Sequence, residues 1–152
     1  MHDPSHWAEG FKQLLINPEF HLSEHFRTNF VPLYWIMRIN GDGLEAGAGT
    51  ARGAILAKRL LPDLRVVALD IDPSVCKIAR EYARRTSASI EIVQGDVFKL
   101  PFADNEFTVS FSSGLLEHYS DAENSMTLPA FSNSLNHSTF PIALSSPYSL
   151  FR

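Results

Sequence analysis

The chain has 152 residues, 45% hydrophobic and 20% charged, which is ordinary for a globular protein with one core. Its net charge of −4 argues against nucleic acid as a partner, because no basic excess is present to displace a polyanion's counterions. The single cysteine, Cys76, excludes an internal disulfide, and no apolar run approaches the roughly 20 residues of a membrane span. Because the first ten residues also lack the features of a signal peptide, we expect a cytoplasmic protein.

Residues 1–39 are rich in aromatic, apolar and histidine residues, and we expect them to form an N-terminal helical segment. Pro18 and Pro32 interrupt this segment, so two or three short helices are predicted. The turn signal "NGDG" at residues 40–43 then marks the start of a different pattern, which we assign to an α/β core over residues 40–123.

Short apolar runs alternate with amphipathic ones in this core. Strands are predicted at residues 43–46, 65–69, 89–94 and 107–112, and helices at residues 51–61 and 73–85. Asp72 and Pro73 suit the N-cap and first position of the second helix. This order of elements predicts an α/β fold with a doubly wound, Rossmann-like, mostly parallel sheet and N-terminal helices.

Residues 124–152 are expected to form an irregular tail. From Met126 onward there is no acidic residue, and Arg152 is the sole basic one. The best strand candidate, "FPIALSS" at residues 140–146, contains Pro141, which cannot donate to a ladder, and no amphipathic helix precedes it. We therefore expect a sheet that is incomplete at its C-terminal side, with the fourth strand as an exposed edge. A truncation, a shifted reading frame or a natural irregular extension would each produce this pattern.

The stretch "LEAGAGT" at residues 44–50 places Glu45 just before Gly47 and Gly49 in a strand-to-helix turn. Glycines in such a turn allow the backbone to approach a ligand closely. The dinucleotide fingerprint needs a third glycine where Arg52 stands, and the lysine of a P-loop is absent, so neither NAD nor ATP is expected to bind. A carboxylate at Glu45 would repel phosphate and attract an ammonium group, which indicates a zwitterionic ligand.

Acidic residues also follow the second and third predicted strands. Asp70 ends the second strand, where a carboxylate can accept hydrogen bonds from both hydroxyls of a ribose. Asp96 comes just after the third strand. The carboxyl ends of parallel strands meet at one crevice, where open α/β sheets bind ligands. S-adenosylmethionine (SAM) matches these requirements because it joins an adenosine to an amino acid without phosphate, although Glu45 and Asp70 could instead cap neighbouring helices.

Four stretches in order resemble the successive motifs of class I SAM-dependent methyltransferases. They are "LEAGAGT", "VVALDIDPSVCKIAR", "IEIVQGDVFKLPFADNEF" and "FSSGLLEH", and the resemblance covers roughly residues 42–121. The resemblance implies that Glu45, Gly47 and Gly49 lie along the methionine end of SAM. It further implies that Asp70 holds the ribose and that Ile71 packs on the adenine.

The later motifs carry further expectations from the same resemblance. Asp96 is expected to accept a hydrogen bond from the adenine amino group, with Val97 beside the ring. Ser112 and Ser113 would face the sulfonium of SAM at the end of the fourth strand. The chain departs from the family pattern at Ala51, where many members have a third glycine, and at Thr108, where aspartate is common.

The predicted activity is methyl transfer from SAM to an unidentified acceptor. No N/D-P-P-Y/F motif of the kind found in many nucleic-acid base methylases follows the fourth strand, which favours a small-molecule acceptor such as a quinone precursor or a lipid. His118, in a predicted helix start at residues 115–118, could act as a general base or be structural. A non-catalytic SAM-binding module is the alternative, and the sequence does not indicate the oligomeric state.

A zinc enzyme is a further alternative, because "HLSEH" at residues 21–25 matches the H-x-x-E-H signature. On a helix, His21 and His25 would share a face near Glu24. No third ligand is evident, and flanking Phe20 and Leu22 suit a helix packed on the core. We therefore predict no metal at this segment and interpret Cys76 as a small buried residue.

Overall fold

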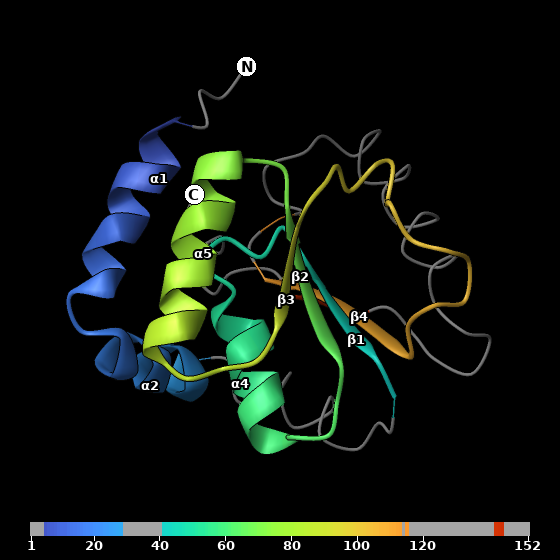
Figure 1. Cartoon of the computed structure of the whole chain (residues 1–152), viewed down its shortest axis with the longest axis horizontal. Coiled ribbons are helices and arrows are strands. Elements are labelled where there is room, and N and C mark those ends of the chain that lie inside the picture. The colour runs from blue at the N-terminus through green and yellow to red at the C-terminus, as the bar shows by residue number, and fades with distance from the viewer. Residues whose placement is uncertain (1–4, 29–40, 114, 116–141, 145–152) are drawn as a thin grey trace.

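The computed structural model describes residues 5–28, 41–113, 115 and 142–144 (Figure 1). The N-terminal helices are α1 (Ser5–Lys12), the short 3₁₀ helix η1 (Gln13–Leu15) and α2 (Pro18–Thr28). The remaining elements, in chain order, are β1 (Gly43–Ala46), α4 (Arg52–Leu60), β2 (Val66–Asp70), α5 (Pro73–Arg85), β3 (Glu91–Gln94), β4 (Val109–Ser113) and β5 (Ile142–Leu144). Figure 1 shows α1, α4 and α5 to one side of the sheet.

The sheet has the order β3-β2-β1-β4-β5, and every neighbouring pair is parallel. Leu44 of β1 lies opposite Val67 of β2 on one side and Ser110 of β4 on the other. The strand order runs outward in both directions from β1, so the predicted doubly wound α/β fold is confirmed. The chain reverses its winding direction between β1 and β4, and ligands bind at such a switch point in open α/β sheets.

Alternate residues of β2 enter two different apolar clusters. Val66 and Ala68 pack with α4 and α5 residues, whereas Val67 and Leu69 pack on the opposite face with Phe107. Side chains alternate across a strand, so this division shows that β2 is buried on both faces. The long connection between β3 and β4 supplies much of the second cluster, including Val97 and Phe107.

Helix α5 begins where Asp72 and Pro73 predict it. The Asp72 carboxylate accepts hydrogen bonds from the backbone N–H groups of Ser74 at 2.7 Å and Val75 at 3.4 Å. Asp72 is therefore the N-cap of this helix, as its sequence context indicates. Cys76 is buried on the inner face of α5, in keeping with its interpretation as a small apolar residue.

The C-terminal tail contributes one strand to the sheet. Strand β5 pairs with β4 in parallel, with Ile142 opposite Phe111. The expectation of an irregular tail that supplies no fifth strand is therefore wrong at residues 142–144, and β4 is not the predicted exposed edge because it pairs with both β1 and β5. Pro141 precedes the strand, where a proline need not donate to the ladder. The apolar run Ile-Ala-Leu suits a parallel sheet.

The other predictions for the C-terminal part concern residues outside the described part of the chain. They include most of the helix start predicted at residues 115–118, of which only Leu115 is described, and the irregular structure predicted for residues 124–141 and 145–152. Among the helices that the structure describes, none is long and apolar enough to cross a membrane.

Candidate cofactor site

The turn after β1 adopts a backbone conformation that favours glycine. Gly47 has a φ of 64° and Gly49 a φ of 55°, both in the left-handed region. A Cβ atom at Gly47 would lie 2.5 Å from Cδ1 of Leu115, and one at Gly49 would lie 3.1 Å from Cζ of Phe11. Any larger residue at these two positions would be both strained and crowded, so only glycine fits this turn at the switch point of the sheet.

Ala51, at the N-cap of α4, shares this left-handed conformation with a φ of 59°. It stands where many members of the resembled family have a third glycine. Its methyl group is fully buried. The alanine is therefore accommodated, but it holds a conformation that costs a non-glycine residue about 1–2 kcal/mol.

Asp70 joins the glycine turn to the loop that follows β2. Its Oδ2 accepts a hydrogen bond from Gly49 N at 2.9 Å, and its Oδ1 accepts one from Asp72 N at 3.0 Å. Burial raises the pKa of Asp70, and these two backbone N–H groups partly offset that effect. Each carboxylate oxygen retains a second lone pair. Asp70 can therefore accept further hydrogen bonds from a ligand at the carboxyl ends of the strands.

Glu45 has only 3% of its surface exposed, and its carboxylate reaches the first turn of α4. Its Oε2 accepts a hydrogen bond from Ala54 N at 2.7 Å, which matters because the N-cap residue Ala51 has no side chain able to cap the helix. Burial raises the pKa of Glu45 to about 7, against the opposing effects of the Ala54 N–H and of Arg52. Glu45 thus caps α4, which agrees with the alternative interpretation that this residue caps a neighbouring helix. Contact with the methionine end of SAM stays a prediction.

Asp96 lies in a tight turn after β3, close to Asp70. Its Oδ1 accepts a hydrogen bond from Phe98 N at 2.9 Å, and its carbonyl accepts one from Lys99 N at 3.0 Å. Gly95 N donates to the Asp70 carbonyl at 2.9 Å, which ties this turn to the end of β2. The structure therefore brings together the glycine turn, Asp70 and Asp96 at the carboxyl ends of β1, β2 and β3.

The two apolar residues predicted beside the adenine differ in exposure. Ile71 is 58% exposed, which is unusual for a large aliphatic side chain next to a carboxylate at a strand end. Val97 is buried in the apolar cluster on the face of the sheet opposite α4 and α5, together with Leu69 and Phe107. Ile71 can therefore pack directly on a ligand, whereas Val97 packs within the core, and its place beside the adenine stays a prediction.

Ser112 lies at the end of β4 and is 1% exposed, as is Ser110 two residues before it. Neither hydroxyl has a hydrogen-bond partner among the residues that the structure describes. The side chain of Ser113 and the whole of His118 lie outside the described part of the chain. The predicted contacts of these three residues with SAM or its acceptor stay predictions.

The zinc alternative receives no support from the geometry. His21 lies on α2 and stacks edge-on against Phe20, with 5.4 Å between the ring centroids. The side chains of Glu24 and His25 are outside the described part of the chain. Within the part that is described, no three His, Cys, Asp or Glu side chains gather as metal ligands.

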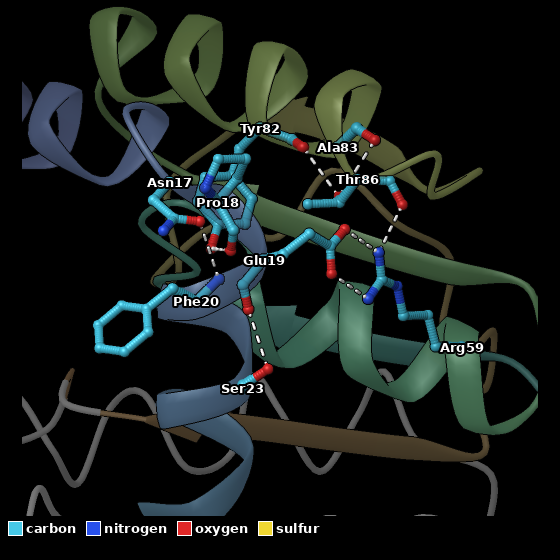
Figure 2. A network of polar contacts seen from close by, with 9 residues as sticks. All are labelled: Asn17, Pro18, Glu19, Phe20, Ser23, Arg59, Tyr82, Ala83 and Thr86. Atoms are coloured by element: carbon cyan, nitrogen blue, oxygen red, sulfur yellow. Dashed lines mark hydrogen bonds and ion pairs between the residues drawn. The ribbon is translucent and has the colours of Figure 1, made fainter.

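Sequence reasoning missed the way in which the N-terminal helices are held against α4 and α5. Tyr82 Oη donates a hydrogen bond to the Pro18 carbonyl at 2.6 Å (Figure 2). Arg59 donates to both carboxylate oxygens of Glu19, at 2.8 and 2.6 Å, and also to the Thr86 carbonyl at 2.7 Å. These partners are at least 27 residues apart in the sequence, and no motif or periodicity relates them.

The family described as "Methyltransferase domain" matches residues 44–138, more than half of the chain. The chain belongs to this methyltransferase family. The assignment confirms the resemblance to class I SAM-dependent methyltransferases and the prediction of SAM as the cofactor. The glycine turn at Gly47 and Gly49 and the acceptor at Asp70 fit this cofactor. The zinc alternative is not favoured.

The curated relatives of this methyltransferase include enzymes named for quinone biosynthesis. This chain is 37% identical over 96 residues to the ubiquinone/menaquinone biosynthesis C-methyltransferase UbiE of Ectopseudomonas oleovorans. The match covers 59% of this chain and 56% of the relative. The chain is 40% identical over 65 residues to the demethylmenaquinone methyltransferase of Staphylococcus carnosus, covering 42% of this chain and 27% of the relative. The matches thus cover about half or less of these relatives.

Solved structures share the fold of this methyltransferase at low sequence identity. The PH0226 protein of Pyrococcus horikoshii superposes with a TM-score of 0.75 at 23% identity, covering 84% of this chain and 59% of that protein. The geranyl diphosphate C-methyltransferase of Streptomyces coelicolor, solved with S-adenosyl-L-homocysteine, gives a TM-score of 0.65 at 14% identity, covering 78% of this chain and 46% of that enzyme. These two likenesses support the Rossmann-like fold.

Proposed function

We propose that this methyltransferase binds SAM across the carboxyl ends of β1, β2 and β3 and transfers its methyl group to a small-molecule acceptor. The observation that carries the proposal is the position of Asp70, whose two oxygens join Gly49 of the glycine turn to the loop before α5. Those two hydrogen bonds orient the carboxylate at the carboxyl end of β2, where open α/β sheets bind ligands and where it can accept from both ribose hydroxyls.

The other predicted contacts extend from Asp70 in two directions. Toward β1, the methionine end lies along the backbone of the glycine turn at Gly47 and Gly49, beside the Leu115 and Phe11 side chains that pack against this turn. Toward β3, the exposed Ile71 packs on one face of the adenine, and the Asp96 carboxylate accepts from its amino group. The proposed site thus recognises an adenosine and an amino acid.

When bound, SAM supplies a methyl group that is activated by its bond to a sulfonium. The sulfur is the leaving group and becomes a neutral thioether when the methyl group is transferred. The task left to the protein is to align the acceptor with that methyl group and to exclude water, which is proximity catalysis. A general base is required only for an acceptor that must lose a proton first, and His118 is the proposed base in that case. For the acceptor we propose a quinone precursor, because relatives that share 37% identity are named for ubiquinone and menaquinone biosynthesis.

Calorimetric titration with SAM tests the binding proposal. We expect the wild-type chain to bind SAM and Asp70→Ala to bind it less tightly by about 1.5–3 kcal/mol, the range for hydrogen bonds to a charged group. Asp63→Ala is the matched control, because Asp63 is an exposed carboxylate before β2, at the opposite end of that strand. Equal affinity in the Asp70 and Asp63 variants would refute the ribose assignment. SAM binding without methyl transfer to any quinone precursor would favour the non-catalytic alternative.

A further inference from the structure

Helix α1 lies along the first half of α5, close to the cofactor site. Ala8 of α1 forms a buried cluster with Val75 and Ile78 of α5, and Phe11 and Leu15 pack against this cluster. Figure 1 shows the two helices side by side. Because α5 begins two residues after Ile71, this packing brings α1 next to the loop that carries Asp70.

One residue of α1 reaches the glycine turn itself. A Cβ atom at Gly49 would lie 3.1 Å from Cζ and 3.4 Å from Cε2 of Phe11. The edge of the phenyl ring therefore rests against the backbone of the second glycine. The same glycine donates its N–H to Asp70 Oδ2 at 2.9 Å. Gly49 is thus contacted by a carboxylate through its N–H and by an aromatic ring at its Cα.

The position of this ring is held by contacts of the segment that follows α1, from η1 to the start of α2. Arg85 donates a hydrogen bond to the Leu15 carbonyl at 2.8 Å, and Tyr82 donates to the Pro18 carbonyl at 2.6 Å. The paired hydrogen bonds between Arg59 and Glu19 lie one residue further on (Figure 2). Donors from α4 and α5 thus fix the turn between α1 and α2, and they hold α1 on α5 with Phe11 at Gly49.

We propose that Phe11 forms an apolar side of the cofactor site at the methionine end and that α1 excludes water from it. This inference rests on the proposed binding of SAM. A phenyl ring offers a large apolar surface at a small cost in conformational entropy, and excluding water strengthens the electrostatic contacts within a site. Phe11 is then a positioning residue for the methionine end. The two donors that orient Asp70, the proposed ribose acceptor, are the backbone N–H groups of Gly49 and Asp72, and both are retained when the ring is removed.

The test compares two probes by calorimetry, S-adenosylhomocysteine and adenosine. For Phe11→Ala, we expect the dissociation constant of S-adenosylhomocysteine to rise about tenfold and that of adenosine to change by less than about twofold. Leu15→Ala is the matched control. It removes a neighbouring apolar side chain that packs on the same cluster, whereas the three atoms nearest to a Cβ at Gly49 all belong to Phe11, so it should lower stability and leave both affinities unchanged.

The outcomes separate this inference from the proposed function. A wild-type chain that binds neither SAM nor S-adenosylhomocysteine refutes the proposed function itself. A wild-type chain that binds, together with a Phe11→Ala variant of equal affinity or with equal losses for the two probes, overturns the role of Phe11 alone. Should Phe11→Ala not fold, hydrogen exchange of the wild type decides the matter. We expect saturating S-adenosylhomocysteine to slow exchange in residues 8–12, and unchanged exchange there would overturn the inference.

Discussion

The carboxylate of Glu45, at the end of β1, accepts a hydrogen bond from the backbone N–H of Ala54 in the first turn of α4 at 2.7 Å. The two residues are nine positions apart, and the glycine turn lies between them. This contact satisfies a donor that the N-cap residue Ala51 cannot reach. A buried acid therefore holds together the strand and the helix that flank the cofactor turn.

The raised pKa of Glu45 predicts a pH-dependent stability. Burial raises this pKa from its ordinary value of 4.5 to about 7, so the folded chain binds a proton that the unfolded chain releases between these values. The free energy of unfolding should therefore fall as the pH rises through this window, by up to about 3 kcal/mol. Urea unfolding of the wild type and Glu45→Gln at pH 5 and pH 7.5 measures the effect. The variant should gain stability relative to the wild type at the higher pH, and an unchanged difference would contradict the assignment.

The hydrogen bond to Ala54 predicts a difference between two substitutions at Glu45. Glu45→Gln retains an oxygen that can accept from Ala54 N, whereas Glu45→Ala leaves that buried N–H without its partner. At pH 7.5 we expect Glu45→Ala to be less stable than Glu45→Gln by about 1–3 kcal/mol, the cost of an unsatisfied buried group. Denaturant midpoints at constant slope give this difference, and equal midpoints would show that the capping contact contributes nothing.

We expect the substitution Ala51→Gly to lower the free energy of unfolding less than is usual for a buried alanine. Its left-handed φ of 59° is costly for alanine and free of cost for glycine, so relief of strain offsets the lost methyl group. Ala57, buried within α4 with helical geometry, is the control. We expect Ala57→Gly to cost about 1–2 kcal/mol more than Ala51→Gly, measured by thermal or urea unfolding. A larger loss at Ala51 than at Ala57 would contradict this reasoning.

Because the hydroxyl of Ser110 is buried without a described partner, we expect its removal in Ser110→Ala not to destabilise the core. This group is buried in β4 and has no hydrogen-bond partner among the described residues, so its desolvation is uncompensated there. Ser110→Ala should leave stability unchanged or raise it by about 1 kcal/mol. Thr86→Val is the contrasting variant, because Thr86 Oγ1 donates to the Tyr82 carbonyl at 2.9 Å and its loss should be destabilising. A clear loss of stability in Ser110→Ala would show that the hydroxyl has a partner.

Contacts between the N-terminal helices and α5 predict a loss of stability in Tyr82→Phe. The substitution removes the hydrogen bond to the Pro18 carbonyl and keeps the buried ring, so a cost of about 1 kcal/mol is expected. Arg84→Gln is the control, because the Arg84–Glu81 ion pair within α5 is exposed and should contribute little. Equal stability of Tyr82→Phe and the wild type would show that this contact does not hold α2 in place.

The sequence alone determined the elements whose signals are local. Apolar runs and helical periodicity indicate β1 to β4, α4 and α5, and Asp72 with Pro73 predicts the start of α5 because a cap and a proline act within one turn. Gly47, Gly49, Asp70 and Asp96 were predicted as a cofactor site because parallel strands present their carboxyl ends at one edge. A local pattern was sufficient wherever the physical cause lies within a few residues along the chain.

Only the tertiary structure decided which residues meet across long separations. Strand β5 follows Pro141 in a stretch without strand periodicity, and its place is determined by pairing with β4. Phe11 reaches Gly49 because α1 packs on α5, and Arg59 reaches Glu19 from a helix 40 residues away. These contacts arise from the close packing of layers, in which the neighbours of a side chain depend on the whole fold. Residue types along the chain therefore predict the cofactor, and the packed fold determines what surrounds it.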